Sequence, residues 1–186
     1  MSEVLNEHEN KRMLSEDIFY PDHDQRTESP TFLETKRKGH ALGLRCAISG
    51  TRLDVEYHHA FCEWAFAGGV DWHTVKGIAL GTIKELPVLD LVTDQPTAEM
   101  APVEGFLIYL ICEYFKYKGF DWEAFDPDKP ETLVDSLEAM IVLNKKFHRG
   151  KDHGVHSITG PIHFFQAFPR KPGFIFSPDE MIKAHQ

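Results

Sequence analysis

The chain has 186 residues, of which 42% are hydrophobic and 26% are charged, and its formal net charge is −9. This length is enough for one domain with a hydrophobic core and too short for two full-sized domains. The longest uninterrupted apolar stretch, residues 106–112, falls far short of the roughly 20 residues that a membrane-spanning helix needs, so we expect no membrane partner.

The cysteines and the first residues of the chain indicate a cytoplasmic location. The N-terminus turns charged within a few residues and contains no apolar segment typical of a signal peptide. Cys46, Cys62 and Cys112 are widely spaced and include no CxxC pair, which argues against a disulfide framework and against a four-cysteine zinc site.

Charge is distributed unevenly along the chain. Residues 36–60 carry five basic and two acidic side chains, and residues 141–186 carry seven basic and three acidic ones. Residues 1–35 and 61–140 are strongly acidic. If the fold brings the two basic blocks together, they create a local positive field suited to a phosphate group; chance clustering of surface charges is the alternative.

The first segment, residues 1–38, is polar, acidic and weakly periodic, and Pro21 and Pro30 interrupt it. Such a segment buries too little apolar surface to fold alone. We therefore predict a flexible acidic arm, with a short helix near residues 9–17, followed by a single domain over residues 39–186.

The next segment predicts a β-hairpin. Residues 44–48 have the composition of a strand, Ser49-Gly50-Thr51 is typical of a turn, and residues 53–58 alternate strictly between apolar and polar side chains. The predicted hairpin ends in the consecutive pair His58-His59.

A long acidic section follows, and we predict that residues 61–137 form a mostly helical insertion. Its clearest helix spans residues 104–118, where an apolar stripe recurs at helical spacing until Gly119. Shorter helices are expected over residues 62–67 and 131–140, whereas the pattern over residues 75–92 fits either a helix or a strand.

After a brief apolar run at residues 141–143, the pattern predicts a helix that begins near Asn144 and carries residues 145–149. Asn144 is expected to cap this helix, since asparagine is a preferred N-cap residue. Residues 161–168 form a further amphipathic piece.

The histidines are the main candidates for chemistry. Besides His58 and His59, the sequence places His148, His153, His156 and His163 within sixteen residues near the C-terminal end. Neighbouring residues on a strand point to opposite faces, so one imidazole of the pair could bind a metal while the other acts as a base. Further ligands could come from His148 with His156 or His153. A packing role for His163, an exposed loop position for His153 and a buried apolar role for Cys46 are the plainer interpretations.

Two segments resemble HNH (ββα-metal) endonucleases of phage and prophage type. Residues 46–50, Cys-Ala-Ile-Ser-Gly, followed by Val-Glu-Tyr-His-His-Ala over residues 55–60, are similar to the first half of the family motif. Leu143, His148 and the run Gly154-Val155-His156 are similar to the second half. The resemblance covers residues 44–60 and 138–168, and it implies an α+β fold with a hairpin-plus-helix core.

The resemblance also implies a set of roles. His58, His148 and His156 would hold one divalent metal ion (Mg²⁺, Mn²⁺, Ni²⁺ or Zn²⁺), and His59 would be the general base that activates water for attack on a phosphodiester. The basic side chains near the second half would bind neighbouring phosphates: Lys145, Lys146, Arg149 and Lys151. The implied substrate is DNA, and the location is the host cytoplasm if a phage encodes the protein.

Two alternatives remain open. The chain could be a non-catalytic relative of the same fold, a metal-stabilised module that binds DNA, or a protein partner through the acidic residues 61–137. It could instead be an acidic DNA mimic that inhibits a nuclease. An active site requires an exposed His59, whereas a structural site would bury this residue or use it as a fourth ligand.

Overall fold

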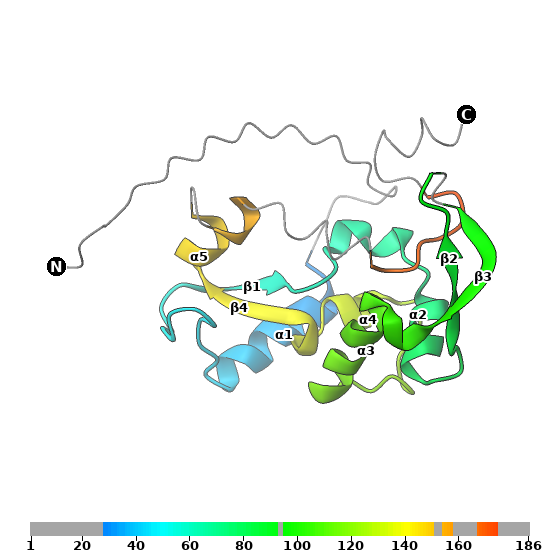
Figure 1. Cartoon of the computed structure of the whole chain (residues 1–186). Coiled ribbons are helices and arrows are strands. Elements are labelled where there is room, and N and C mark those ends of the chain that lie inside the picture. Colours follow the sequence, from blue (N-terminus) through cyan, green and yellow to red (C-terminus); the bar gives the residue numbers. More distant parts are fainter. Residues whose placement is uncertain (1–27, 93–94, 151–153, 158–166, 175–186) are drawn as a thin grey trace, which may run out of the picture.

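Two separate two-stranded antiparallel sheets, connected by helices, form an α+β structure (Figure 1). The computed structural model describes residues 28–92, 95–150, 154–157 and 167–174. The helices are α1 (Pro30–Ala41), α2 (Trp72–Ala79), α3 (Leu107–Tyr117), α4 (Glu131–Val134) and α5 (Lys145–Arg149). The strands are β1 (Val55–His59), β2 (Glu85–Leu89), β3 (Pro96–Pro102) and β4 (Met140–Asn144). Four 3-10 helices complete the described elements: η1 (Trp64–Gly69), η2 (Val103–Gly105), η3 (Leu137–Ala139) and η4 (Val155–Ser157).

The first sheet pairs β1 with β4 and continues directly into α5. In this antiparallel register His58 lies opposite Ile141, and His59 lies opposite Met140. The predicted hairpin is therefore wrong in its pairing, because residues 44–48 form no strand: residues 44–46 are irregular, and a turn begins at residue 47. Only part of that segment touches the sheet, where the Ala47 amide donates to the Val142 carbonyl at 2.8 Å. Strand β4 is the better partner for β1 because Met140, Val142 and Leu143 are buried in the pair.

Helix α1 packs against this sheet and corrects the boundary of the predicted arm. Ser29 caps the helix by accepting a hydrogen bond from the Phe32 amide at 3.0 Å, and Pro30 occupies the first turn, as is common. Phe32 is buried beside Tyr57, Met140 and Val142 in a small apolar cluster. Residues 30–38 are therefore helical; the remainder of the predicted arm, residues 1–27 with the short helix expected at 9–17, lies outside the described residues.

The section between β1 and β4 is built around the main hydrophobic core. Helix α3 agrees with the predicted helix, and α2 resolves the ambiguous pattern that begins at residue 75. The helix expected over residues 131–140 is only the four-residue α4 followed by η3, and the one expected over 62–67 is η1. The section is also less helical than predicted, because β2 and β3 form a hairpin.

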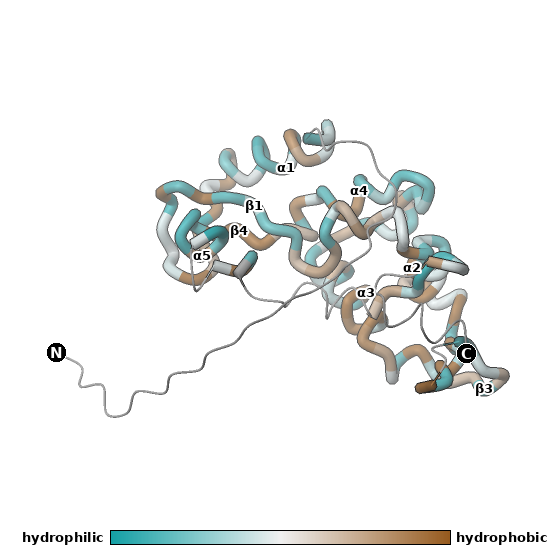
Figure 2. Tube along the Cα trace, turned by 90° about the horizontal axis from the view of Figure 1, so that it is seen from above, coloured by the Kyte–Doolittle hydropathy of each residue, from teal (hydrophilic) through white to brown (hydrophobic). Residues whose placement is uncertain are grey.

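Figures 1 and 2 place the β2–β3 hairpin at the opposite end of the molecule from α5. Strand β3 is largely exposed and β2 is half-buried along its middle, and Leu91 and Val92, which follow β2, expose 89% and 73% of their surface. Within the described residues, no helix is both long and apolar enough to cross a membrane.

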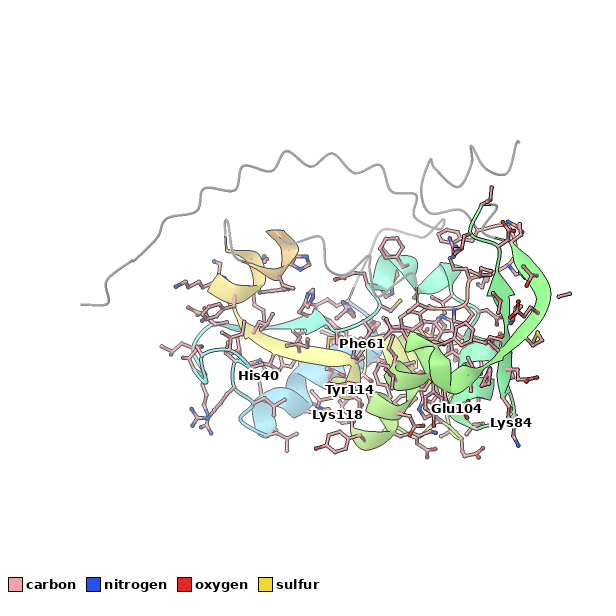
Figure 3. All side chains as sticks on the ribbon, in the orientation of Figure 1. His40, Phe61, Lys84, Glu104, Tyr114 and Lys118 are labelled. Atoms are coloured by element: carbon pink, nitrogen blue, oxygen red, sulfur yellow. The ribbon has the colours of Figure 1, made fainter. Side chains whose placement is uncertain are left out.

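Aromatic contacts join the β1–β4 sheet to the main core. Phe61 follows β1 directly, and its ring lies 5.0 Å from that of Tyr114 and 5.7 Å from that of Phe115, both on α3. Figure 3 shows Phe61 and Tyr114 near this junction, with Lys84 and Glu104 at the far end. The sheet is thus anchored at the point where the chain leaves His59.

Candidate metal centre

Three histidines from distant parts of the sequence meet beside the β1–β4 sheet. One ring nitrogen from each of His58, His148 and His156 lies within 4.8 Å of the others. His58 stands on β1, His148 on α5 and His156 on η4, and the Nε2 atoms of His148 and His156 are 2.9 Å apart. Their spacing matches a set of imidazole ligands converging on one cation. The predicted proximity of these residues is confirmed; their binding of a metal stays a prediction.

His148 is held in place by a carboxylate from β1. Its Nδ1 lies 2.6 Å from Glu56 Oε2, and the Arg149 Nε donates to the same oxygen at 2.9 Å. A second Arg149 nitrogen donates to the other oxygen, so the guanidinium forms a bidentate pair with the Glu56 carboxylate. These partners hold the pKa of Glu56 below its usual range although burial acts in the opposite direction. Because Glu56 occupies Nδ1 of His148, Nε2 is the ring nitrogen that remains to face His156.

His58 is buried without a hydrogen-bond partner for its Nδ1 atom. The residue exposes 4% of its surface, and burial lowers the pKa of its imidazole to about 4, although the charge of Glu63 acts in the opposite direction. The Oε1 atom of Glu63, which also lacks a hydrogen-bond partner, lies 3.8 Å from that nitrogen. These two atoms are exceptions to the rule that buried polar atoms are hydrogen-bonded, and they face each other.

The site opens to solvent on the side of His156. This residue is exposed, whereas the side chain of His148 exposes only 11% of its surface. Gly154 brings η4 close to the end of α5, where its amide donates to the Gly150 carbonyl at 2.8 Å. A Cβ atom at Gly154 would lie 2.6 Å from that carbonyl oxygen, so this approach requires glycine.

His59 occupies a different environment from its neighbour His58. It exposes 5% of its surface, stacks on Phe32 and places Nε2 2.9 Å from Asp135 Oδ1. Its Nδ1 lies 3.5 Å from Glu63 Oε2. Burial by itself lowers the pKa of His59, but the two carboxylates outweigh this effect and raise the pKa above its ordinary value. In this arrangement the imidazolium form is favoured, and the ring does not face solvent.

Asp135 connects His59 to helix α1. This carboxylate is fully buried, and its Oδ2 accepts a hydrogen bond from the Ser29 hydroxyl at 2.6 Å. The hydroxyl of Thr35 donates to the Asp135 backbone carbonyl at 2.7 Å. A buried polar chain thus runs from the N-cap of α1 through Asp135 and His59 to Glu63, which lies next to His58.

The residues predicted to bind phosphate differ in whether an acidic side chain already pairs with them. Lys145 and Lys146 at the start of α5 are exposed, and neither forms an ion pair with an acidic side chain among the described residues. Arg149 is also exposed but is paired with Glu56. Lys151, His153 and His163 lie outside the described residues, as does most of the amphipathic segment expected over residues 161–168.

Sequence reasoning identified the three clustered histidines but missed the carboxylates that surround them. Glu56 could have been noticed, because residues two apart on a strand share a face and Glu56 precedes His58 by two. No comparable signal marks Asp135, which is 76 positions from His59. Asn144 caps α5 as expected, accepting from the Lys146 amide at 2.9 Å, and its side-chain amide also donates to the Leu53 carbonyl at 2.7 Å.

Comparisons with protein-family models, curated proteins and solved structures yield no significant match to this chain.

Proposed function

We propose that this protein is a metal-dependent phosphodiesterase that hydrolyses nucleic acid, DNA in the first instance, at a site of the HNH (ββα-metal) kind. The observation that carries this proposal is the convergence of His58 on β1, His148 on α5 and His156 on η4, beside an antiparallel strand pair whose second strand, β4, leads into α5. The order of strand, strand and helix corresponds to the ββα label of the family. The resemblance assigns the same three histidines as metal ligands.

The residues fit a divalent metal. One ring nitrogen from each of the three histidines lies within 4.8 Å of the others, and three imidazoles suit Ni²⁺ or Zn²⁺ better than Mg²⁺ or Mn²⁺, which prefer oxygen. Three protein ligands with one exposed side also match a site that keeps a position for substrate. When bound there, such an ion would polarise the phosphodiester and stabilise the departing oxygen.

His59 is the general base of this proposal, and the geometry sets a condition on that role. Asp135 holds Nε2, so Nδ1 is the nitrogen that would take the proton from water, and it can do so only when the ring is neutral and no longer held as an imidazolium by the two carboxylates. Glu63 Oε2 faces this nitrogen at 3.5 Å. Water therefore reaches His59 only if Oε2 of Glu63 moves off this nitrogen, which the carboxylate could do while Oε1 stays beside His58. Lys145 and Lys146, on the helix that carries His148, would hold phosphates on either side of the cleaved bond without reading sequence.

A second candidate function is a metal-stabilised binding module without catalysis. The burial of His59 between two carboxylates is the observation that favours it, because a base shielded from water cannot act. In that case the metal at His58, His148 and His156 would fix the junction of β1, α5 and η4, and DNA or a protein would bind outside it.

Nicking of supercoiled plasmid separates the two candidates. Purified protein is tested with Mg²⁺, Mn²⁺, Ni²⁺ or Zn²⁺ beside His148→Ala, His59→Ala and the control His73→Ala, whose side chain is exposed on α2. Cleavage lost in the first two variants and kept in the third supports the phosphodiesterase. Cleavage that survives His148→Ala contradicts it. If no metal gives cleavage but Zn²⁺ raises the melting temperature, the binding module is supported instead.

A further inference from the structure

The environments of His58 and His148 share a pattern that the sequence motif does not contain. Each ring directs its Nδ1 atom at a glutamate: His148 lies 2.6 Å from Glu56 Oε2, and His58 lies 3.8 Å from Glu63 Oε1. The first distance is a strong charge-assisted hydrogen bond. The second lies just beyond hydrogen-bond range, and both of its atoms are buried and otherwise unpartnered.

Metal-binding histidines usually donate their second ring N–H to a carboxylate or carbonyl, which fixes the ring orientation and makes the other nitrogen a better ligand. Glu56 already serves His148 in this way, since the Nε2 of His148 faces His156. Glu63 is the matching group for His58.

We propose that Glu63 and Glu56 are paired positioning residues of the metal centre, Glu63 accepting the Nδ1 proton of His58 as Glu56 accepts that of His148, so that both histidines bind the cation through Nε2. This inference rests on the metal site of the proposed function and adds two residues that the resemblance does not assign. Neither glutamate touches the cation.

Each glutamate is itself anchored, as a positioning role requires. Arg149 holds both oxygens of Glu56. On the other side, Oε2 of Glu63 faces His59 Nδ1 at 3.5 Å, and His59 is fixed by Asp135, which the Ser29 hydroxyl holds in turn. The adjacent histidines of β1 therefore belong to one assembly, in which His59 and His58 approach opposite oxygens of the same carboxylate.

Zinc affinity provides the first test. Competition with a chromophoric chelator is measured for the full chain and for Glu63→Gln, Glu56→Gln and the control Glu113→Gln, a carboxylate paired with Lys116 on the surface of α3. Loss of an outer partner of this kind typically weakens metal binding by about 10- to 100-fold. We expect that loss for Glu63→Gln and Glu56→Gln and none for Glu113→Gln. Wild-type affinity in Glu63→Gln would overturn the inference.

Histidine ¹⁵N spectra of the Zn²⁺-loaded wild-type chain give a second test that needs no variant. The expected pattern is a proton on Nδ1 and the metal on Nε2 for both His58 and His148. Coordination of His58 through Nδ1 would overturn the inference even if Glu63→Gln failed to fold.

The outcomes distinguish this inference from the proposed function. If the wild-type chain binds Zn²⁺ with both glutamates contributing but cuts no DNA, the inference stands and the phosphodiesterase fails. If the wild-type chain binds neither Zn²⁺ nor the other three ions, both are overturned.

Discussion

His59 Nε2 and Asp135 Oδ1 lie 2.9 Å apart in a contact between residues separated by 76 positions in the sequence. Both side chains are almost completely buried, with 5% and 1% of their surface exposed. The contact joins β1 to the segment just after α4, and through Ser29 to the start of α1. It therefore links three segments that lie far apart in the sequence.

We expect Asp135→Ala to destabilise the protein strongly, because it leaves His59 buried without its principal carboxylate. Removing one partner of a buried pair typically costs about 3–5 kcal/mol. Urea unfolding monitored by circular dichroism measures the change. The exposed pair of His73 and Asp128, 71% and 82% exposed, supplies the control: Asp128→Ala should leave the midpoint unchanged. Equal midpoints for the two variants would contradict a structural role for the buried contact.

The low pKa of His58 predicts that the metal-free protein loses stability in mild acid. In the unfolded chain this histidine titrates near pH 6.5, whereas in the folded chain its pKa is about 4. Between these values the unfolded state binds more protons, so stability falls as the pH falls, by about 3 kcal/mol at pH 4 from this group alone. Urea midpoints in EDTA at pH 7, 6 and 5 should decline less steeply in His58→Leu than in the wild type. Parallel declines would show that another group is responsible.

His59 predicts the opposite trend at higher pH. Its folded pKa is raised, so its contribution is fully present below the unfolded value near 6.5 and is lost as the pH rises through the folded value. His59→Gln should therefore destabilise the protein more at pH 6 than at pH 9. A difference in unfolding free energy that does not change over this interval would mean that His59 is not held as an imidazolium between Glu63 and Asp135.

Gly154 is expected to control the position of His156. A Cβ atom there would meet the backbone of Gly150 at 2.5 Å, so Gly154→Ala must push η4 away from α5. We predict weaker Zn²⁺ binding in the variant, measured by chelator competition, because one ligand is displaced from the other two. Gly105→Ala is the matched control, since a Cβ at that position meets nothing within 4 Å. Unchanged affinity in Gly154→Ala would place His156 outside the metal site.

The local parts of the structure could be predicted from the sequence. Helix α3 and the Asn144 cap of α5 depend on spacing and on short-range preferences. The grouping of His58 with His148 and His156 is not local, and it follows from the resemblance to the HNH motif. The strand predicted over residues 53–58 corresponds to β1, but the partner predicted for it, residues 44–48, is wrong. Ser49-Gly50-Thr51 is a good turn signal, and pairing across a turn needs less loop closure than pairing across 80 residues.

The errors come from contacts between distant segments. Burial of Met140, Val142 and Leu143 outweighs the entropy cost of closing the long loop, and β1 therefore pairs with β4. The carboxylate of Asp135 lies 76 positions from His59, and no sequence pattern connects it to the histidine pair. Strands β2 and β3 contain Pro87 and Pro96, which are typical of loops and of exposed strand edges.

Lys145 and Lys146 predict how DNA binding should respond to salt. Each phosphate contact made by a lysine contributes about 0.9 to the slope of log affinity against log salt concentration for duplex DNA. Replacing both lysines with glutamine should therefore weaken binding at low salt and make the slope shallower by about 2. Fluorescence anisotropy in EDTA, where cleavage is suppressed, measures both quantities. Lys84 and Lys118 are exposed lysines far from α5, and replacing them is the control that should change neither value (Figure 3). If the two double variants behave alike, nucleic acid does not bind beside the histidine cluster, and the acidic section between β1 and β4 becomes the surface to examine for a protein partner.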